Sequence, residues 1–275
     1  MKFIFDNGGQ TCNKFWSYLA PLQYAYQNKE KLYVIYPDKD LRDFPNLTNN
    51  PYIRFPLYSP YINNLVKSSC WEKICRLILG KFIHVHSIIK IVYPRMLWNA
   101  WHSHKALDFN QIRPLAHEIF QPDEKIITLI SKIFDQKRHL FDIIVGLHIR
   151  RGDYKTWKNG KFYFNDEEYL TCCKRILNFF PKKRVGFFIA STDFISESSF
   201  SEIDYFQIPD ATGPIDLYGL SKCDYIFGPP STFSNWAAFY GNHPIKFIEN
   251  IQSFDPTPSL CLDKYNYPTW SEDYK

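Results

Sequence analysis

Short apolar runs alternate with amphipathic stretches along the chain, and this alternation predicts its secondary structure. Apolar runs predict buried strands at residues 3–5, 32–36, 143–147, 185–190, 205–209, 225–227 and 245–248. Apolar residues at helical spacing predict helices at 13–27 (kinked at Pro21), 63–92, 123–141, 166–179 (capped by Asn165), 216–221 and 235–240. Prolines and asparagines predict irregular loops at 41–62. Strands that alternate with helices in this way indicate an α/β fold.

The alternation occurs twice, which predicts two α/β lobes joined near residue 140 with a cleft between them. The expected domains are an N-terminal lobe at residues 1–140 and a C-terminal lobe at residues 141–275. An aromatic-rich tail, Tyr265 to Tyr274, ends the chain. It either packs back across the first lobe or lies free.

The composition describes a globular protein without a membrane-spanning segment. Hydrophobic residues make up 45% of the 275 residues, which is ample material for a core and unlike a disordered chain. No stretch reaches the length of about 18 uncharged apolar residues that a spanning helix needs, and the N-terminus is too short in apolar residues for a signal peptide. The seven cysteines form no C-x-x-C pair, so free thiols in a reducing cytoplasm are expected.

The net charge of +5 is concentrated in one segment. Between Tyr61 and Ala106 lie Lys67, Lys73, Arg76, Lys81, Lys90, Arg95 and Lys105, against the single acid Glu72. One interpretation is a solvated helical face. The other is a basic surface that rests on anionic lipid at the inner face of the plasma membrane, with Trp71, Trp98 and Trp101 at the interface.

The richest chemistry follows the strand at 143–147. There His148, two adjacent arginines (Arg150 and Arg151) and Asp153 follow the apolar run. Ligands of open α/β sheets bind beyond the carboxyl ends of strands, and guanidinium groups fit phosphate oxygens. The pattern therefore predicts an anion site, most naturally for a diphosphate, with a surface ion-pair cluster as the alternative.

A second candidate site is the turn that follows the strand at 225–227. Pro229 and Pro230 stiffen the turn, and Ser231, Thr232 and Phe233 open the next helix. A helix N-terminus offers unpaired N–H groups that suit a phosphate. The alternative is an ordinary serine N-cap.

Two weaker candidates lie elsewhere along the chain. Gly8 and Gly9 follow the first strand, where glycine allows the backbone to approach a ligand closely, although the turn lacks the dinucleotide-binding spacing. Ser191 and Asp193 end another strand, and Asp216 lies downstream. A carboxylate at either aspartate can accept two hydrogen bonds from a guanine edge or from sugar hydroxyls.

A metal site is not expected. Asp38 and Asp40 imitate the D-x-D pattern of metal-dependent glycosyltransferases, in which two carboxylates hold a divalent cation. They are followed by Arg42 and Asp43, as in a charged surface loop. We therefore predict no metal and no cofactor.

Three motifs together resemble the α1,2-fucosyltransferase family, which is glycosyltransferase family 11 within the GDP-fucose-dependent superfamily. Residues 148–154 match H-x-R-R-x-D-Y, residues 216–223 match D-[LM]-x-x-[LM]-S-x-C, and residues 231–238 match S-[ST]-F-[SG]-x-W-[GA]-A. Gly8, Gly9, Asn13 and Phe15 match the N-terminal G-G-x-x-N-x-x-F pattern only in part. The resemblance is therefore closer in the second half of the chain.

The resemblance implies a GT-B-like fold with two Rossmann-like lobes and a metal-independent, inverting fucosyltransferase. The donor would be GDP-fucose. The acceptor would be a hydroxyl of a free or lipid-linked glycan, with an α1,2 linkage formed in surface polysaccharide or glycan biosynthesis. No nucleic acid partner is implied. The alternatives are transfer from another nucleotide sugar and a non-catalytic binding relative, which would not need adjacent phosphate-binding arginines.

Carried over residue by residue, the resemblance gives Arg150, Arg151 and Asp153 as the catalytic set. Arg150 and Arg151 would bind the diphosphate, and Asp153 would either orient them or serve as the general base, with the orienting role preferred. The expected substrate-binding residues are His148, Gly8, Gly9, Asn13, Ser191, Asp193, Asp216, Ser231, Thr232 and Phe233.

Overall fold

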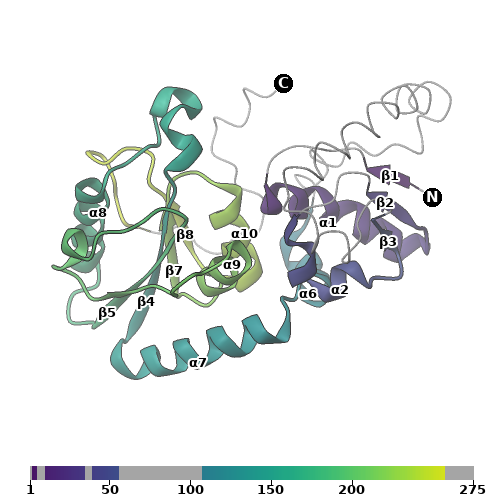
Figure 1. Ribbon diagram of the computed structural model, residues 1–275, viewed down its shortest axis with the longest axis horizontal. Coiled ribbons are helices and arrows are strands. Elements are labelled where there is room, and N and C mark those ends of the chain that lie inside the picture. The colour runs from purple at the N-terminus through teal and green to yellow at the C-terminus, as the bar shows by residue number, and fades with distance from the viewer. Residues whose placement is uncertain (1, 5–9, 35–38, 56–106, 258–275) are drawn as a thin grey trace. The chain divides into compact units, whose positions relative to one another are not determined.

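The computed structural model describes residues 2–4, 10–34, 39–55 and 107–257 (Figure 1). Contacts divide the chain into one unit at Met1–Asp123 and another at Glu124–Lys275. The predicted boundary near residue 140 therefore falls at the far end of a helix, α7 (Glu124–Leu140), that packs within the second unit against α9 (Gly213–Leu220) and β4 (Ile143–Ile149).

The first unit contains a small parallel sheet of order β1-β2-β3. Its strands are β1 (Lys2–Ile4), β2 (Leu32–Val34) and β3 (Ile53–Arg54). Its helices are α1 (Thr11–Asn28), the short 3-10 helix at Lys39–Asp43, α2 (Pro45–Thr48) and α6 (Phe109–Ile119). The segment predicted as loop at 41–62 thus contains short elements.

Helix α1 has a mostly aromatic core around it. The ring of Phe15 lies 4.8 Å from the rings of both Phe44 and Phe120, so the start of the helix is held by two later segments. The helix continues through Pro21 to Asn28. Asp108 caps α6 by accepting hydrogen bonds from the backbone of its first turn.

The second unit is built on a five-stranded parallel sheet of order β6-β5-β4-β7-β8. After β4, its strands are β5 (Val185–Ser191), β6 (Tyr205–Phe206), β7 (Tyr225–Gly228) and β8 (Ile245–Phe247). Its other helices are α8 (Asp166–Phe179), α10 (Thr232–Gly241) and short 3-10 turns at Gly152–Lys155, Trp157–Gly160 and Glu197–Phe200.

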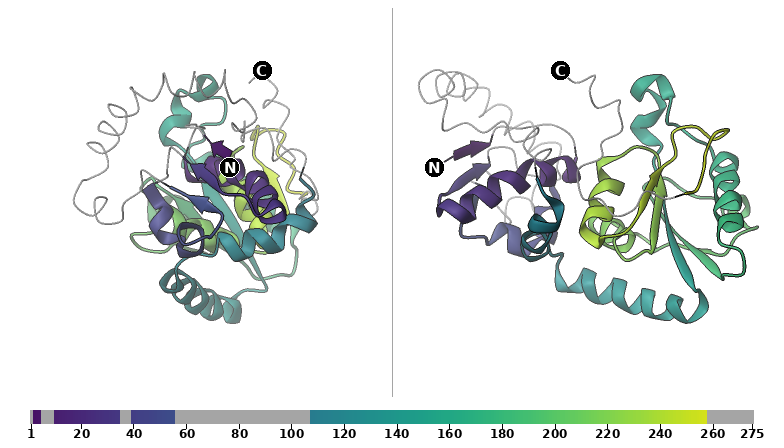
Figure 2. Two further views of the ribbon diagram at one scale, coloured as in Figure 1. Left: turned by 90° about the vertical axis from the view of Figure 1, so that its right-hand side faces the viewer. Right: turned by 180° about the vertical axis from the view of Figure 1, so that it is seen from behind.

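Helices cover both faces of this sheet (Figure 1 and Figure 2). Alternate residues of β4, among them Val145, Leu147 and Ile149, join the core beneath α8. The residues between them face the other side, where a Cβ on Gly146 would collide with Leu220 of α9. Because both faces of the sheet are buried, the sequences of its strands are continuous apolar runs.

The sequence predictions for the second unit are largely confirmed. Helix α8 begins and ends where expected, because the Asn165 side chain and Glu168 form a reciprocal capping box. Two predicted helix starts at 216 and 235 are wrong by three residues, since α9 begins at Gly213 and α10 at Thr232. The predicted strand at 205–209 is shorter, at Tyr205–Phe206.

Several predictions lie outside the described residues. These are the helix at 63–92, the basic membrane-facing surface and the C-terminal tail. No helix in the described part of the chain combines the length and apolar character needed to cross a membrane.

Candidate functional site at the sheet switch point

The strand order of the second unit places the two strongest sequence motifs side by side. The chain passes from β4 outward to β5 and β6, and β7 then pairs with the opposite edge of β4 before β8 follows. The reversal creates a switch point between β4 and β7, the usual ligand position in such sheets. The Arg150–Arg151 pair follows β4 and the Ser231 turn follows β7, so both motifs lie at this point.

A glycine allows these two strand ends to approach closely. A Cβ on Gly228 would lie 2.7 Å from the carbonyl oxygen of His148 and 2.9 Å from its Cβ. Any larger side chain would therefore push β7 away from β4 at the edge where the two motifs meet.

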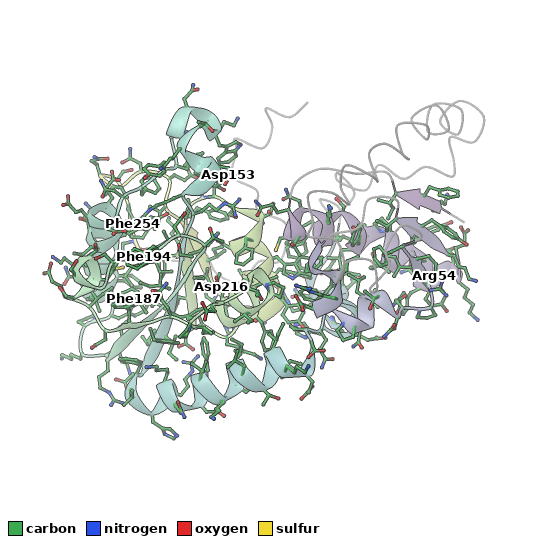
Figure 3. All side chains as sticks on the ribbon, viewed as in Figure 1. Arg54, Asp153, Phe187, Phe194, Asp216 and Phe254 are labelled. Atoms are coloured by element: carbon green, nitrogen blue, oxygen red, sulfur yellow. The ribbon has the colours of Figure 1, made fainter. Side chains whose placement is uncertain are left out.

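Arg150 lies at the end of β4, and its guanidinium contacts an exposed carboxylate. Its Nε and Nη2 lie 3.0 and 2.9 Å from the same oxygen of Asp153, whose side chain is 60% exposed. The guanidinium also lies over the ring of Tyr154. A solvated carboxylate binds weakly, so a dianionic ligand can displace Asp153 at small cost. Figure 3 labels Asp153 on this loop.

Arg151 has a different environment from its neighbour. Its Nε donates to the carbonyl of Phe164 at 3.0 Å, and its Nη2 forms an ion pair with Asp166 in the first turn of α8. The side chain is 13% exposed and lies over the ring of Tyr169. These contacts tie the loop that follows β4 to the start of α8.

His148 is buried beneath the site and joins its two halves. Its Nδ1 lies 2.7 Å from the hydroxyl of Ser234 in α10, and its ring lies 5.0 Å from that of Phe233. Burial, followed by the charge of Arg150, lowers the pKa of His148 to about 3. The imidazole is therefore neutral and fixes the first turn of α10 to β4.

The N-terminus of α10 forms the other wall of the site. Ser231 caps the helix by accepting the N–H of Phe233 at 3.2 Å, and Thr232 is its first residue. The hydroxyl of Tyr154 donates to the carbonyl of Pro230 at 2.5 Å. Burial raises the pKa of Tyr154 to about 12, so the phenol stays protonated and holds the turn against the arginine loop.

One further carboxylate of this unit follows the end of β5, and another lies in the first half of α9. The backbone N–H of Asp193 donates to the Ser191 hydroxyl at 3.1 Å at the end of β5, and its Oδ2 is buried without a hydrogen-bond partner in the described part of the chain. Asp216, labelled in Figure 3, is 6% exposed in the first half of α9. Among the described residues nothing bonds its carboxylate, and burial raises its pKa to about 7.

Helix geometry orients Asp216 toward this edge of the sheet. Gly219 follows one turn later on the same face of α9, and a Cβ there would collide with Phe188 of β5. Asp216 therefore also faces the sheet, and it lies one helical turn nearer than Gly219 to the carboxyl ends of the strands. An unpaired carboxylate in that position is a strong acceptor for a ligand that donates hydrogen bonds.

Four of the residues that the sequence analysis singled out fall in the first unit and are not described at the side chain or at all. Gly8, Gly9 and Asp38 lie outside the described residues, as does the side chain of Asp40. Asn13 lies in α1, where its carbonyl accepts the Ser17 hydroxyl. Among the described residues, no three His, Cys, Asp or Glu side chains gather as a metal site would require.

Two contributors were not predicted from the sequence. Tyr154 belongs to the H-x-R-R-x-D-Y motif, so its spacing to Arg150 was a usable signal. Asp166 carried none, because nothing in the local sequence links it to the loop that follows β4.

The sequence profile described as Glycosyl transferase family 11 matches residues 104–270, more than half of the chain. No curated protein matches it in sequence.

Solved structures of fucosyltransferases share its fold. NodZ from Bradyrhizobium is 16% identical over 94% of this chain and 97% of its own, with a TM-score of 0.52. FUT1 from Arabidopsis thaliana, in complex with GDP, is 13% identical over 94% of this chain and 73% of its own, with a TM-score of 0.54. POFUT1 in complex with GDP is 12% identical over 90% of this chain and 98% of its own, with a TM-score of 0.54. At such identities the likeness establishes the fold, and it confirms the predicted GT-B-like α/β class.

Proposed function

The chain belongs to glycosyl transferase family 11, and from that premise we propose that it transfers fucose from GDP-fucose to a glycan hydroxyl. The family supports sugar transfer. Fucosyltransferases of the same fold have been solved with GDP, which supports a GDP-linked donor. We propose an α1,2 linkage to a glycan of a surface polysaccharide, and the resemblance of residues 148–154 and 231–238 to the family motifs supports it.

The observation that carries the proposal is the juxtaposition of Arg150 and the α10 N-terminus at the switch point. A departing GDP gains negative charge on its diphosphate as the bond to the sugar breaks. A guanidinium on one side and the N–H groups of Ser231 and Thr232 at the start of α10 on the other favour that charge. Fixed cationic and dipolar groups aimed at the leaving group lower the barrier without needing a metal ion, so we propose metal-independent transfer.

The two arginines have different roles in this proposal. Arg150 faces a carboxylate that solvent already screens, so we assign it to the diphosphate. Arg151 is held by Phe164 and Asp166, so we assign it to positioning the loop that carries Arg150. Asp153 keeps the Arg150 guanidinium oriented in the absence of ligand, rather than serving as the base.

The two carboxylates suit the nucleoside. The guanine edge presents two N–H donors side by side, which match the two oxygens of one carboxylate. Asp216, buried and unpaired within the described part of the unit, is our assignment for guanine, and Asp193 is our assignment for ribose hydroxyls. UDP and CDP do not offer the same pair of donors, so this assignment predicts selectivity for GDP.

Calorimetric titration with GDP, UDP and CDP, each with and without EDTA, tests the proposal. We expect GDP to bind most tightly of the three nucleotides, with an affinity that EDTA does not change. We also expect the protein to transfer fucose from GDP-fucose to a suitable glycan. Arg150→Ala should weaken GDP binding. Arg184→Ala is the matched control, because Arg184 also pairs with an exposed aspartate, Asp142, but precedes β5 at the opposite edge of the sheet.

The outcomes separate the alternatives. Equal binding of all three nucleotides would remove guanine recognition and leave transfer from another nucleotide sugar. Glycan binding that survives Arg150→Ala, with no nucleotide binding in any form, would indicate a non-catalytic relative. Binding that requires a divalent ion would refute the metal-independent mechanism.

A further inference from the structure

Asn235, in the first turn and a half of α10, has a side chain with no hydrogen bond to any described residue. The residue is 1% exposed, and both Oδ1 and Nδ2 are buried without a hydrogen-bond partner in the part of the chain that the structure describes. A side-chain amide can donate two hydrogen bonds and accept two. Buried amides are nearly always bonded, so an unbonded one requires an explanation.

Three neighbouring polar groups of α10 have partners. The hydroxyl of Ser234 bonds His148, that of Ser231 accepts the N–H of Phe233, and the backbone N–H of Asn235 donates to the Ser231 carbonyl at 3.1 Å. Within the described residues of α10, the buried side-chain atoms that lack a partner both belong to Asn235. This selectivity points to a ligand rather than to a poorly packed helix.

Helix geometry directs this amide toward the candidate anion site. Asn235 follows Ser231 by four residues and Thr232 by three, so the three side chains share one face of α10. Side chains of a helix also lean toward its N-terminus. The amide of Asn235 thus lies one turn below the capping serine and is tilted toward it.

The chemistry of an amide narrows the class of ligand. A diphosphate offers only acceptors, which would satisfy Nδ2 and leave Oδ1 unbonded. A sugar hydroxyl both donates and accepts, and it satisfies both ends of the amide. Resting on the proposed function, we propose that Asn235 is a specificity-determining residue that hydrogen-bonds a sugar hydroxyl of the nucleotide sugar, adjacent to the diphosphate.

The test compares wild-type protein with Asn235→Leu and Asn235→Ala by calorimetry, using GDP-fucose, GDP and 2′,3′-dideoxy-GDP. We expect each variant to lose about tenfold in affinity for GDP-fucose, the loss of one good hydrogen-bonded contact. If affinity for GDP is unchanged, the hydroxyl belongs to fucose. If the loss extends to GDP but not to the dideoxy nucleotide, it belongs to ribose.

Two results would overturn the inference. One is unchanged affinity of both variants for all three nucleotides. The other is an equal loss for GDP and dideoxy-GDP, which would assign the amide to the diphosphate. If the wild-type protein binds none of the nucleotides, the proposed function itself fails, so the two failures are distinguishable.

A stability measurement separates binding from structure. Replacing an unbonded buried amide with the apolar isostere leucine removes a buried polar group that has no partner, so Asn235→Leu should raise the Tm of the free protein. Asn50→Leu is the matched control, because buried Asn50 donates to Tyr26 and accepts from the backbone of Tyr52. It should lower the Tm and leave nucleotide affinity unchanged. A marked fall in Tm for Asn235→Leu would assign Asn235 a structural role and refute the inference.

Discussion

Asp216→Asn should make the protein more stable above neutral pH while weakening its affinity for GDP. The carboxylate is 6% exposed, and burial raises its pKa from 3.8 to about 7. In the unfolded chain the same group titrates near its ordinary value. Between these two pKa values the folded protein holds a proton that the unfolded chain has released.

The sign and size of the effect follow from proton linkage. Because the folded state binds more protons, stability falls as pH rises from about 4 to about 7, by about 1.4 kcal/mol for each unit. The shift of about three units corresponds to about 4 kcal/mol of cost once Asp216 is ionised. Asparagine is neutral at all pH values, so the variant avoids this cost. The variant should therefore match wild type near pH 4 and exceed it by up to about 4 kcal/mol at pH 8.

Urea unfolding followed by tryptophan fluorescence at several pH values measures this difference. Subtracting wild type from the variant cancels every other titrating group. Asp135→Asn, which neutralises an exposed carboxylate on α7, is the matched control and should give a flat difference. A flat difference for Asp216→Asn between pH 5 and pH 8 would refute the argument that burial controls this carboxyl group.

Three further changes test the arginine loop. Arg150→Ala should lower kcat by about 100-fold or more in a fucosyl-transfer assay, the usual effect of removing one charge-stabilising group; an unchanged kcat would exclude Arg150 from the reaction. Asp166→Asn should destabilise the protein by about 2 kcal/mol in chemical denaturation, because Arg151 loses its charged partner; equal unfolding midpoints would contradict this. Tyr154→Phe leaves the Pro230 carbonyl without its donor and should cost about 1 to 2 kcal/mol of stability; an unchanged Tm would disprove a structural role for that bond.

Local signals explain which elements could be predicted from the sequence. Both ends of helix α8 were predicted from its apolar spacing and from the cap at Asn165, and the structure adds that Glu168 completes a capping box at its start. The apolar pattern placed the starts of α9 and α10 three residues too late, whereas the serine N-cap signal at Ser231 did mark the start of α10. Helix α6 was not predicted from the sequence. Its start carries a capping aspartate, Asp108, followed by the buried Phe109 and Ile112, but Pro114 inside the helix conceals this pattern.

The site was predictable only as far as residues adjacent in sequence define it. The two motifs at the switch point were identified because each is a contiguous run at the end of a strand. The different roles of Arg150 and Arg151 could not be predicted, since they depend on Asp166 and Phe164, which the fold brings back to the loop. The unbonded amide of Asn235 is likewise a property of packing that no sequence pattern reveals.

The position of β7 beside β4 also determines when the nucleotide site comes into existence during synthesis. His148 and Ser234 are 86 residues apart, and Tyr154 and Pro230 are 76 apart, so both contacts close long loops and form late. A nascent chain that has emerged only through β6 contains both arginines but lacks the second wall of their site. The proposed nucleotide site is therefore complete only after α10 has left the ribosome, so a nucleotide bound there would stabilise the folded unit rather than its folding intermediates.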